Sequence, residues 1–201
     1  DGDTRLTTWF DQFIPSYDFP SSPEAINQVV NDAVWWIDTY DIDGLRQDAV
    51  KHVPHEFWQQ LTKSIKRNFP NKHIYQIGET FGSDDLINSY INPSELDAQF
   101  NFSIYFNART VFSSDNANFT ELGRVINENR ISFGPIHLMG NITSSHDQLR
   151  FAGYADGQIK FSDDGIARSF EQPISEIINQ STYSKLANFY AFNISQPGIP
   201  I

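Results

Sequence analysis

The chain has 201 residues, a formal net charge of −11 at pH 7 and a sequence pI of about 4.7. This length is compatible with one domain, and the acidic balance argues against a nucleic-acid partner, because binding phosphates needs a basic face. The sequence has no cysteine, so no disulfide holds the fold and the redox compartment cannot be inferred. No apolar run is long enough to cross a membrane, which argues against a membrane partner.

The first predicted element is a helix that follows an irregular polar and aromatic stretch over residues 1–21. Asp1 and Asp3 suggest the start of a calcium loop, but the rest of that spacing is absent. A cap, a proline and an acid over residues 22–24 predict a helix start. Apolar residues then recur at helical spacing and predict the buried face: Ile26, Val29, Val30, Ala33, Ile37 and Tyr40. Trp35 and Trp36 lie beside this stripe, and we expect them to pack rather than to contact a ligand.

The next elements alternate between strands and helices. Residues 42–48 form an apolar run that ends in charged side chains and predict a short buried strand. Pro54 opens a second helix that ends before Pro70, with Phe57, Leu61 and Ile65 on one face. Residues 74–79 predict a second strand that also ends in an acid, and residues 83–91 predict a short helix or turn.

The second half repeats the same order. Residues 96–102 predict a third strand, and a helix follows through Ile104, Ala108 and Val111 or Phe112. Residues 118–121 resemble a capping box before another helix, and residues 138–143 predict a fourth strand. Residues 148–181 predict a long loop with short regular pieces. A last helix is indicated by Leu186, Tyr190 and Ile194, and residues 197–201 begin another apolar strand.

Strands that alternate with helices indicate an α/β fold with parallel strands and helical crossovers. No glycine-rich phosphate loop follows the early strands, which argues against a nucleotide-binding sheet. Acidic residues end several different strands, and barrel enzymes collect catalytic groups at that end of their strands. A (β/α) barrel is therefore favoured.

The predicted strand ends carry Asp48, Glu79 and Asp147. Side chains alternate along a strand, so Arg46 and Asp48 share a face. A guanidinium beside a carboxylate favours its ionised form, and a fixed, ionised carboxylate at a strand end is what a glycosidase nucleophile needs. An ion pair that only closes the strand end fits the same two residues.

Two other chemistries fit the sequence less well. His52, His55 and Glu56 do not follow the order of the HExxH zinc motif, and Pro54 interrupts the helix that this motif needs, so we expect no metal site here. His146 and Asp147 could form part of a serine hydrolase triad with Ser144 or Ser145. No GxSxG turn accompanies them, and neighbouring side chains on a strand point apart.

Four stretches together resemble the α-amylase family, glycoside hydrolase family 13: residues 43–52 (DGLRQDAVKH), 78–80 (GET), 145–147 (SHD) and 197–201 (PGIPI). Their order and spacing fit the family's conserved regions over nearly the whole chain. Ser145 stands where many members have asparagine, and residues 141–147 are similar to the cyclomaltodextrinase and neopullulanase group.

The resemblance implies a (β/α)8 TIM barrel, of which residues 1–201 would be the C-terminal portion of the catalytic domain, from about strand 4 to the start of strand 8. Strands 1–3 and the end of strand 8 would then lie outside this sequence. The family's first conserved region, near strand 3, would also lie outside it. We therefore expect the isolated 201 residues to be inactive.

The resemblance also assigns roles to residues. Asp48 would be the nucleophile, Glu79 the general acid and base, and Asp147 the carboxylate that grips sugar hydroxyls. Glu79 would have to carry a proton near neutral pH, while Asp48 would have to remain ionised. The supporting and sugar-contacting residues implied by the family are Arg46, His146, Lys51 and His52.

The implied activity is a retaining glycoside hydrolase that cleaves α-glucans such as starch, maltooligosaccharides, cyclodextrins or pullulan by double displacement, at α-1,4 and possibly α-1,6 bonds. The alternative is a non-catalytic relative kept for sugar binding or as a scaffold. Such relatives usually lose one of the three carboxylates, and all three are present here. No cofactor is expected within this stretch, although the family suggests calcium in a full-length parent. A secreted or periplasmic location is favoured over a cytoplasmic one, and the oligomeric state is left open.

Overall fold

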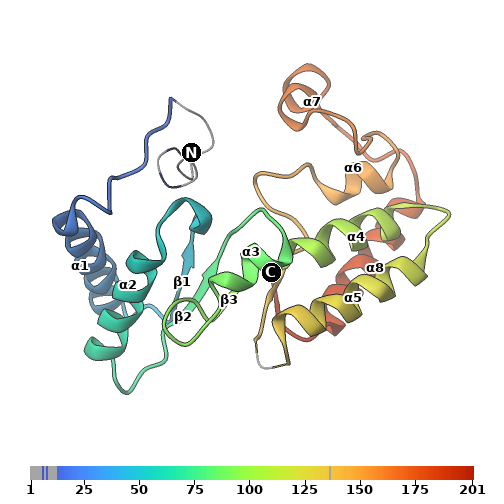
Figure 1. Cartoon of the computed structure of the whole chain (residues 1–201). Helices are drawn as coiled ribbons and strands as arrows, with labels where there is room; N and C mark the ends of the chain where they lie inside the picture. The colour runs from blue at the N-terminus through green and yellow to red at the C-terminus, as the bar shows by residue number, and fades with distance from the viewer. Residues whose placement is uncertain (1–5, 7, 9–12, 136) are drawn as a thin grey trace. The chain divides into compact units, whose positions relative to one another are not determined.

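The computed structural model describes residues 6, 8, 13–135 and 137–201, which fall into two compact units, residues 1–100 and 101–201 (Figure 1). The residues suggested as the start of a calcium loop, Asp1 and Asp3, lie outside the described residues. Within the described part of the chain, no helix is long and apolar enough to cross a membrane.

The first unit contains three parallel strands and the helices between them. Its elements are α1 (Pro23–Tyr40), β1 (Gly44–Gln47), the 3₁₀ turn η2 (Val50–His52), α2 (His55–Asn68), β2 (Tyr75–Gly78), α3 (Asp84–Ser89) and β3 (Ala98–Gln99). The strand order is β1-β2-β3, with Arg46 opposite Ile77 and Ile77 opposite Ala98. The strands predicted over residues 42–48 and 74–79 are confirmed, while β3 is shorter than the strand predicted over residues 96–102.

Helix α1 begins where the sequence predicts. Pro23 occupies its first turn, Glu24 lies near the positive end of the helix dipole, and Asp41 ends the helix in a left-handed conformation with φ 52°. Ile26, Val30 and Ile37 are buried, as the apolar spacing predicts.

The prediction for the C-terminal end of this helix was wrong at Tyr40. This residue is exposed rather than part of the buried face, and the neighbouring Trp35 and Trp36 are half-exposed. The three rings pack on one another instead, with centroids 5.0 Å apart for the two tryptophans and 5.1 Å apart for Trp36 and Tyr40. Aromatic rings that stack on each other satisfy part of their packing without entering the core of this unit.

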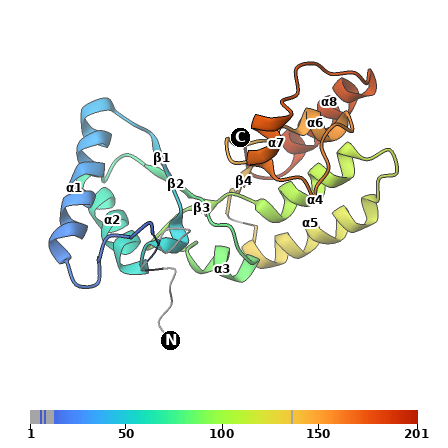
Figure 2. The same ribbon diagram turned by 90° about the horizontal axis from the view of Figure 1, so that it is seen from above.

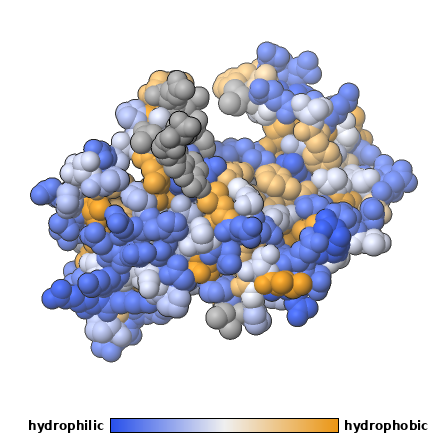
Figure 3. Space-filling view, in the orientation of Figure 1, coloured by the Kyte–Doolittle hydropathy of each residue, from blue (hydrophilic) through white to orange (hydrophobic). Residues whose placement is uncertain are grey.

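Helices α1 and α2 cover one face of the three-stranded sheet (Figures 1 and 2). The predicted face of α2 is confirmed, because Phe57, Leu61 and Ile65 are all buried. They pack in one apolar core with residues of α1 and with residues that adjoin β1 and β2, such as Val50 and Ile74. On the side seen in Figure 3 the surface of these two helices is mostly hydrophilic, as expected for helices that turn their apolar stripe toward a sheet.

The second unit consists mainly of helices around a two-stranded parallel sheet. Its elements are α4 (Phe102–Ser113), α5 (Phe119–Phe133), β4 (Gly140–Asn141), α6 (Phe151–Ala155), α7 (Gly165–Glu171), α8 (Ser181–Ser195) and β5 (Ile199–Pro200). Helix α4 packs against α5, α6 and α8. The short helices α6 and α7 are the regular pieces expected within residues 148–181.

In the second unit, the parallel backbone hydrogen bonds extend beyond the two residues of each regular strand. β4 and β5 pair in parallel, with Gly140 opposite Ile199. The backbone ladder extends further, because Ile199 N–H donates to Met139 and Thr143 N–H donates to Ile201. The strand predicted over residues 138–143 is therefore present as an extended segment with a short regular centre.

Helix caps in this unit come from asparagines. The Asn118 side chain accepts hydrogen bonds from the N–H groups of Thr120 and Glu121 at the start of α5, which confirms half of the predicted capping box. Glu121 pairs with Arg124 one turn along the helix. Asn101 caps α4, and its buried amide also donates to Asn129 on α5.

The predicted last helix is present as α8, but its apolar spacing does not mark the buried residues. Tyr190 and Ile194 are exposed, whereas Thr182, Phe189 and Asn193 are buried. The Thr182 hydroxyl donates to the buried carboxylate of Asp156, so a polar residue enters the interior with its hydrogen bond made. Apolar spacing alone cannot identify such a face.

Candidate active site

Asp48 directly follows β1, at the point where the chain leaves the sheet. The next residue, Ala49, has a φ of 45°, in the left-handed region that residues with a Cβ rarely adopt. The chain then enters η2, where Val50 N–H donates to the carbonyl of Glu79 at 2.9 Å. The backbone after Asp48 is therefore held in an unusual turn by a bond to the neighbouring strand end.

Glu79 directly follows β2 and lies beside Asp48. Its N–H donates to the carbonyl of Gln47 at 2.9 Å, which extends the parallel ladder by one residue. Gly78 precedes it at a crowded point, where a Cβ would lie 2.8 Å from the Val50 side chain and 2.7 Å from that of Leu96. The glycine allows the end of β2 to lie against its neighbours, and so places Glu79.

Arg46 joins the two carboxylates. Its guanidinium makes an ion pair with Asp48 Oδ1, and its Nη2 lies 2.9 Å from Glu79 Oε2. The guanidinium carbon also lies 5.8 Å from the centre of the Phe100 ring. The predicted shared face of Arg46 and Asp48 is present, and the structure adds Glu79 to the same cluster.

The two carboxylates differ in their surroundings. The Asp48 side chain is 53 % exposed, whereas the Glu79 side chain is 6 % exposed. When two neighbouring carboxylates lie in different environments, they can take different catalytic roles. The exposed carboxylate can reach a substrate, and the buried one lies beside it on the same guanidinium.

Lys51 and His52 follow in η2, and both are held by backbone carbonyls. Lys51 Nζ donates to Phe81 at 2.7 Å, which links η2 to the segment after Glu79. His52 is buried, with its Nδ1 3.0 Å from the carbonyl oxygen of Thr8. Both residues lie in the turn beside the carboxylate pair, and their contact with a sugar stays a prediction.

Asp147 and His146 lie in the second unit, beyond the end of β4. Their side chains face each other, with His146 Nε2 3.4 Å from Asp147 Oδ2. His146 is 78 % exposed, and Asp147 N–H donates to the Ser145 hydroxyl at 3.2 Å. The structure therefore gathers Asp48, Glu79 and Arg46 in one unit, and Asp147 with His146 in the other.

Arg109 on α4 holds the segment after Asp147, and the sequence analysis did not identify it. Its Nη1 donates to Gln148 Oε1 at 3.2 Å. Its guanidinium lies over four aromatic rings, at 4.7 to 5.3 Å from the centroids of Tyr154, Phe106, Phe161 and Tyr105. The available signal in the sequence was that Tyr105 and Phe106 lie four and three positions before Arg109, which places them on the same side of a helix.

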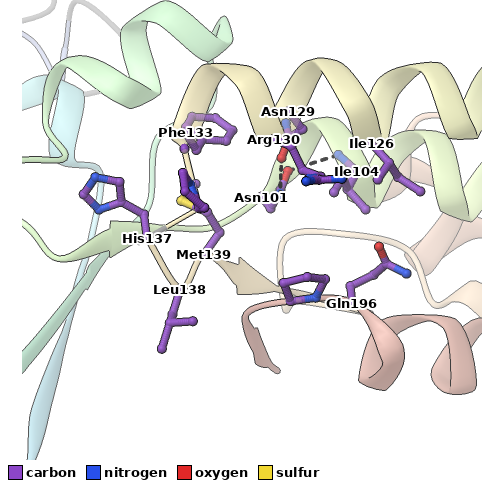
Figure 4. Close-up of a pocket in the computed structure, with 13 residues that line it drawn as sticks. Asn101, Ile104, Ile126, Asn129, Arg130, Phe133, His137, Leu138, Met139 and Gln196 are labelled. Carbon is purple, nitrogen blue, oxygen red and sulfur yellow. Dashed lines mark hydrogen bonds between the residues drawn. The ribbon is translucent and has the colours of Figure 1, made fainter.

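A pocket of about 430 Å³ in the second unit lies between the ends of α5 and α8 and the start of α4 (Figure 4). Asn101 and Asn129 meet on its wall, and Arg130, His137 and Gln196 add polar groups to an otherwise apolar lining. Its described lining residues include none of the predicted site residues. We therefore do not assign the chemistry to this pocket.

Within the described residues, no group of three or more histidine, aspartate or glutamate side chains is placed to hold a metal ion. His55 instead pairs with the buried Glu95, at 2.8 Å between Nδ1 and Oε2. Calcium in a full-length parent therefore stays a prediction.

Parallel strands with helical crossovers, and acidic groups at the ends of neighbouring strands, are features that the chain shares with α/β barrel proteins. The family model "Alpha amylase, catalytic domain" matches residues 10–168, most of the chain. The chain therefore belongs to the α-amylase family, whose members are glycoside hydrolases.

Comparisons with individual proteins also find members of this family. The chain is 33 % identical over 117 residues to alpha-amylase 2 of Schizosaccharomyces pombe, covering 58 % of this chain and 19 % of that protein. It is 26 % identical over 156 residues to the intracellular maltogenic amylase of Bacillus subtilis, covering 70 % and 24 %. The crystal structure of an Anoxybacillus alpha-amylase superposes with a TM-score of 0.75 at 27 % identity, covering 94 % of this chain and 36 % of that one. The chain thus spans about a fifth of the first of these curated relatives and about a quarter of the second.

Proposed function

We propose that the protein carrying this chain is a retaining glycoside hydrolase that cleaves α-1,4 bonds of α-glucans, with α-1,6 bonds as the second candidate. The observation that carries the proposal is the Arg46 guanidinium bonded to both Asp48 and Glu79 at neighbouring strand ends. Carboxylates held by one guanidinium are close together, which favours the retaining spacing of about 5–5.5 Å over the wider spacing of inverting enzymes. The α-glucan substrate is inferred from the amylases to which the chain is similar.

In the first step the Asp48 carboxylate attacks the anomeric carbon as the glycosidic C–O bond breaks. Glu79 transfers its proton to the departing oxygen, so the leaving sugar departs as an alcohol and a glycosyl–Asp48 ester remains. The exposed position of Asp48 suits a group that must reach the sugar. Arg46 orients both groups through its two hydrogen bonds.

In the second step the Glu79 carboxylate takes a proton from water, whose oxygen attacks the anomeric carbon. The ester bond to Asp48 breaks, which restores its carboxylate and releases a sugar with its original anomeric configuration. Asp147 and His146 would hold sugar hydroxyls, and Lys51 and His52 would contact the leaving-group side. These four roles come from the family resemblance.

The proposal is tested by release of reducing ends from maltoheptaose by the full-length protein and its Glu79→Gln variant. Loss of a general acid is expected to lower kcat by about 10²–10⁴-fold. Asp156→Asn is a matched control, because it also converts a buried carboxylate to an amide but lies away from strand ends, and it should keep kcat below its melting temperature. A Glu79→Gln variant as fast as wild type would refute the proposal, and a wild-type protein that binds maltoheptaose without cleaving it would support the scaffold alternative.

A further inference from the structure

A chain of buried polar side chains runs between α2 and the sheet. Gln76 on β2 donates through Nε2 to the Thr62 hydroxyl at 2.6 Å, and this hydroxyl donates to the carbonyl of Glu95 at 2.6 Å. All three residues are buried. Buried polar groups with partners are rigid, because breaking one bond leaves another group unsatisfied.

This network of hydrogen bonds is anchored at Glu95, in the segment before β3. Its carboxylate accepts a hydrogen bond from Gln59 Nε2 at 2.9 Å and lies 2.8 Å from His55 Nδ1. The His55 ring stacks on Tyr90, with centroids 4.1 Å apart. Both carboxylate oxygens therefore have partners on α2, so Glu95 ties α2 to the sheet.

The other end of this hydrogen-bond network reaches β1. Gln47 Nε2 donates to Gln76 Oε1 at 3.2 Å. Gln47 also accepts the N–H of Glu79 on its carbonyl, so it is bonded through both side chain and backbone. Its side chain points to the α2 side of the sheet, whereas the neighbouring Arg46 and Asp48 lie on the opposite face.

Asp48 depends on this arrangement because the Arg46 ion pair holds only its carboxylate, and the backbone that carries it has to be held separately. Its side chain is half-exposed, and the strained backbone of Ala49 follows it. The backbone of Asp48 is held on either side, by Gln47 before it and by the Val50 N–H bond to Glu79 after it. Loss of the Gln47 anchor would let the end of β1 rotate, and small displacements of a reacting group slow catalysis strongly.

We infer that Gln47 is a positioning residue for the nucleophile Asp48, and that Gln76, Thr62 and Glu95 form its anchor. This inference rests on the proposed function. It adds residues on the helix-facing side of the sheet to a reaction that takes place on the other side.

The test uses the full-length protein with Gln47→Leu, Gln76→Leu and the double variant. Each substitution removes an amide while keeping a similar side-chain volume. Gln99→Leu is the matched control, because Gln99 is a buried glutamine of the same sheet that donates to the Ile87 carbonyl at 2.7 Å, outside this chain of bonds. We expect Gln47→Leu and Gln76→Leu to lower kcat on maltoheptaose by about 10–100-fold with little change in KM, and the double variant to be no slower than either. Gln99→Leu should lower Tm without this loss of kcat.

A second substrate separates the nucleophile from the general acid. An aryl α-maltoside with a strongly acidic phenol needs no proton from Glu79, so misplacement of Asp48 should slow its cleavage as much as that of maltoheptaose. Rescue on this substrate would assign the network to Glu79 and overturn the inference, as would Gln47→Leu having the same kcat as Gln99→Leu. If Gln47→Leu fails to fold, Gln76→Leu breaks the same bond from the other side and decides the question. A wild-type protein that cleaves no α-glucan would instead refute the proposed function itself.

Discussion

The Nη2 atom of Arg46, on β1, lies 2.9 Å from the Oε2 atom of Glu79, the residue that follows β2. The same guanidinium pairs with Asp48 on its own strand. Because Glu79 is buried and Asp48 is half-exposed, Arg46 links two carboxylates in different surroundings. The planar guanidinium can hold both at once in a fixed geometry, which a single ammonium group cannot do.

Arg46→Lys should therefore lower kcat on maltoheptaose by about 10²-fold, because the charge remains but the two-sided geometry is lost. The control is Arg124→Lys on the surface of α5, where an arginine also pairs with two carboxylates, Glu121 and Glu128. Those groups are exposed, so this change should leave kcat as it is. An Arg46→Lys variant with the wild-type kcat would contradict the role of Arg46.

Arg109→Met should loosen the segment that follows Asp147. The change removes the bond to Gln148 and the contacts with four aromatic rings, each worth about 0.5–2 kcal/mol. We expect faster proteolytic cleavage near residues 144–150 and a higher KM for maltoheptaose. Arg130→Met, an exposed arginine of α5, should change neither quantity. Unaltered proteolysis and KM in Arg109→Met would show that this arginine does not hold the segment.

Asp156 should give the protein an acid-sensitive contribution to stability. Burial raises the pKa of this carboxyl, but hydrogen bonds from Gln158, Thr182 and the N–H groups of Asn179 and Ile178 outweigh burial and lower the pKa from 3.8 to about 2. Since the folded-state pKa is lower than the unfolded one, this contribution is full above pH 4 and is lost as the pH falls toward 2.

We therefore expect Asp156→Asn to have a lower Tm than wild type at pH 7, with a difference that shrinks between about pH 4 and pH 2. Thermal unfolding followed by circular dichroism at several pH values measures this difference. A difference in Tm that stays constant down to pH 2 would show that the ionised carboxylate is not what stabilises the connection to α8.

Two glycines of the second unit should respond to alanine in opposite directions. Gly198, before β5, has a φ of 135°, and a Cβ there would collide with the Met139 carbonyl and lie 2.6 Å from the Asn141 amide. Gly198→Ala should destabilise the protein by about 1–3 kcal/mol. Gly123 lies within α5, and a Cβ added there would meet no other atom within 4 Å, so Gly123→Ala should stabilise the protein by about 0.5–1 kcal/mol. Urea unfolding of the two variants side by side measures both changes, and equal signs would contradict this account.

The sequence predicted the elements whose apolar period is regular. Helices α1, α2, α4 and α5 lie where spacing and caps place them, because each buries its apolar stripe within its own unit. Apolar spacing did not identify the buried residues of α8, which include Thr182 and Asn193, and the prediction failed at Tyr40, whose ring packs on Trp36 outside the core. Thr182 is buried because it bonds to Asp156, a residue distant in the sequence. Tyr40 stays outside the core because its ring packs on a neighbouring ring of the same helix.

The candidate site could be predicted in part. The shared face of Arg46 and Asp48 follows from the alternation of side chains along a strand, and the structure contains it. The bond from Arg46 to Glu79 depends on the register between β1 and β2, which the sequence does not specify. Gln47 and Glu95 were missed because glutamine and glutamate are usually exposed, although alternation already pointed Gln47 toward the helices.

The measurement that tests the central claim most directly is mass spectrometry of the full-length protein after reaction with an α-glycosyl fluoride whose sugar ring carries a second fluorine. The leaving fluoride needs no proton, and the ring fluorine slows hydrolysis of the glycosyl ester. We expect one added sugar on the peptide that contains Asp48, and no addition in Asp48→Asn. A sugar on another carboxylate, or turnover of maltoheptaose without any adduct, would contradict it.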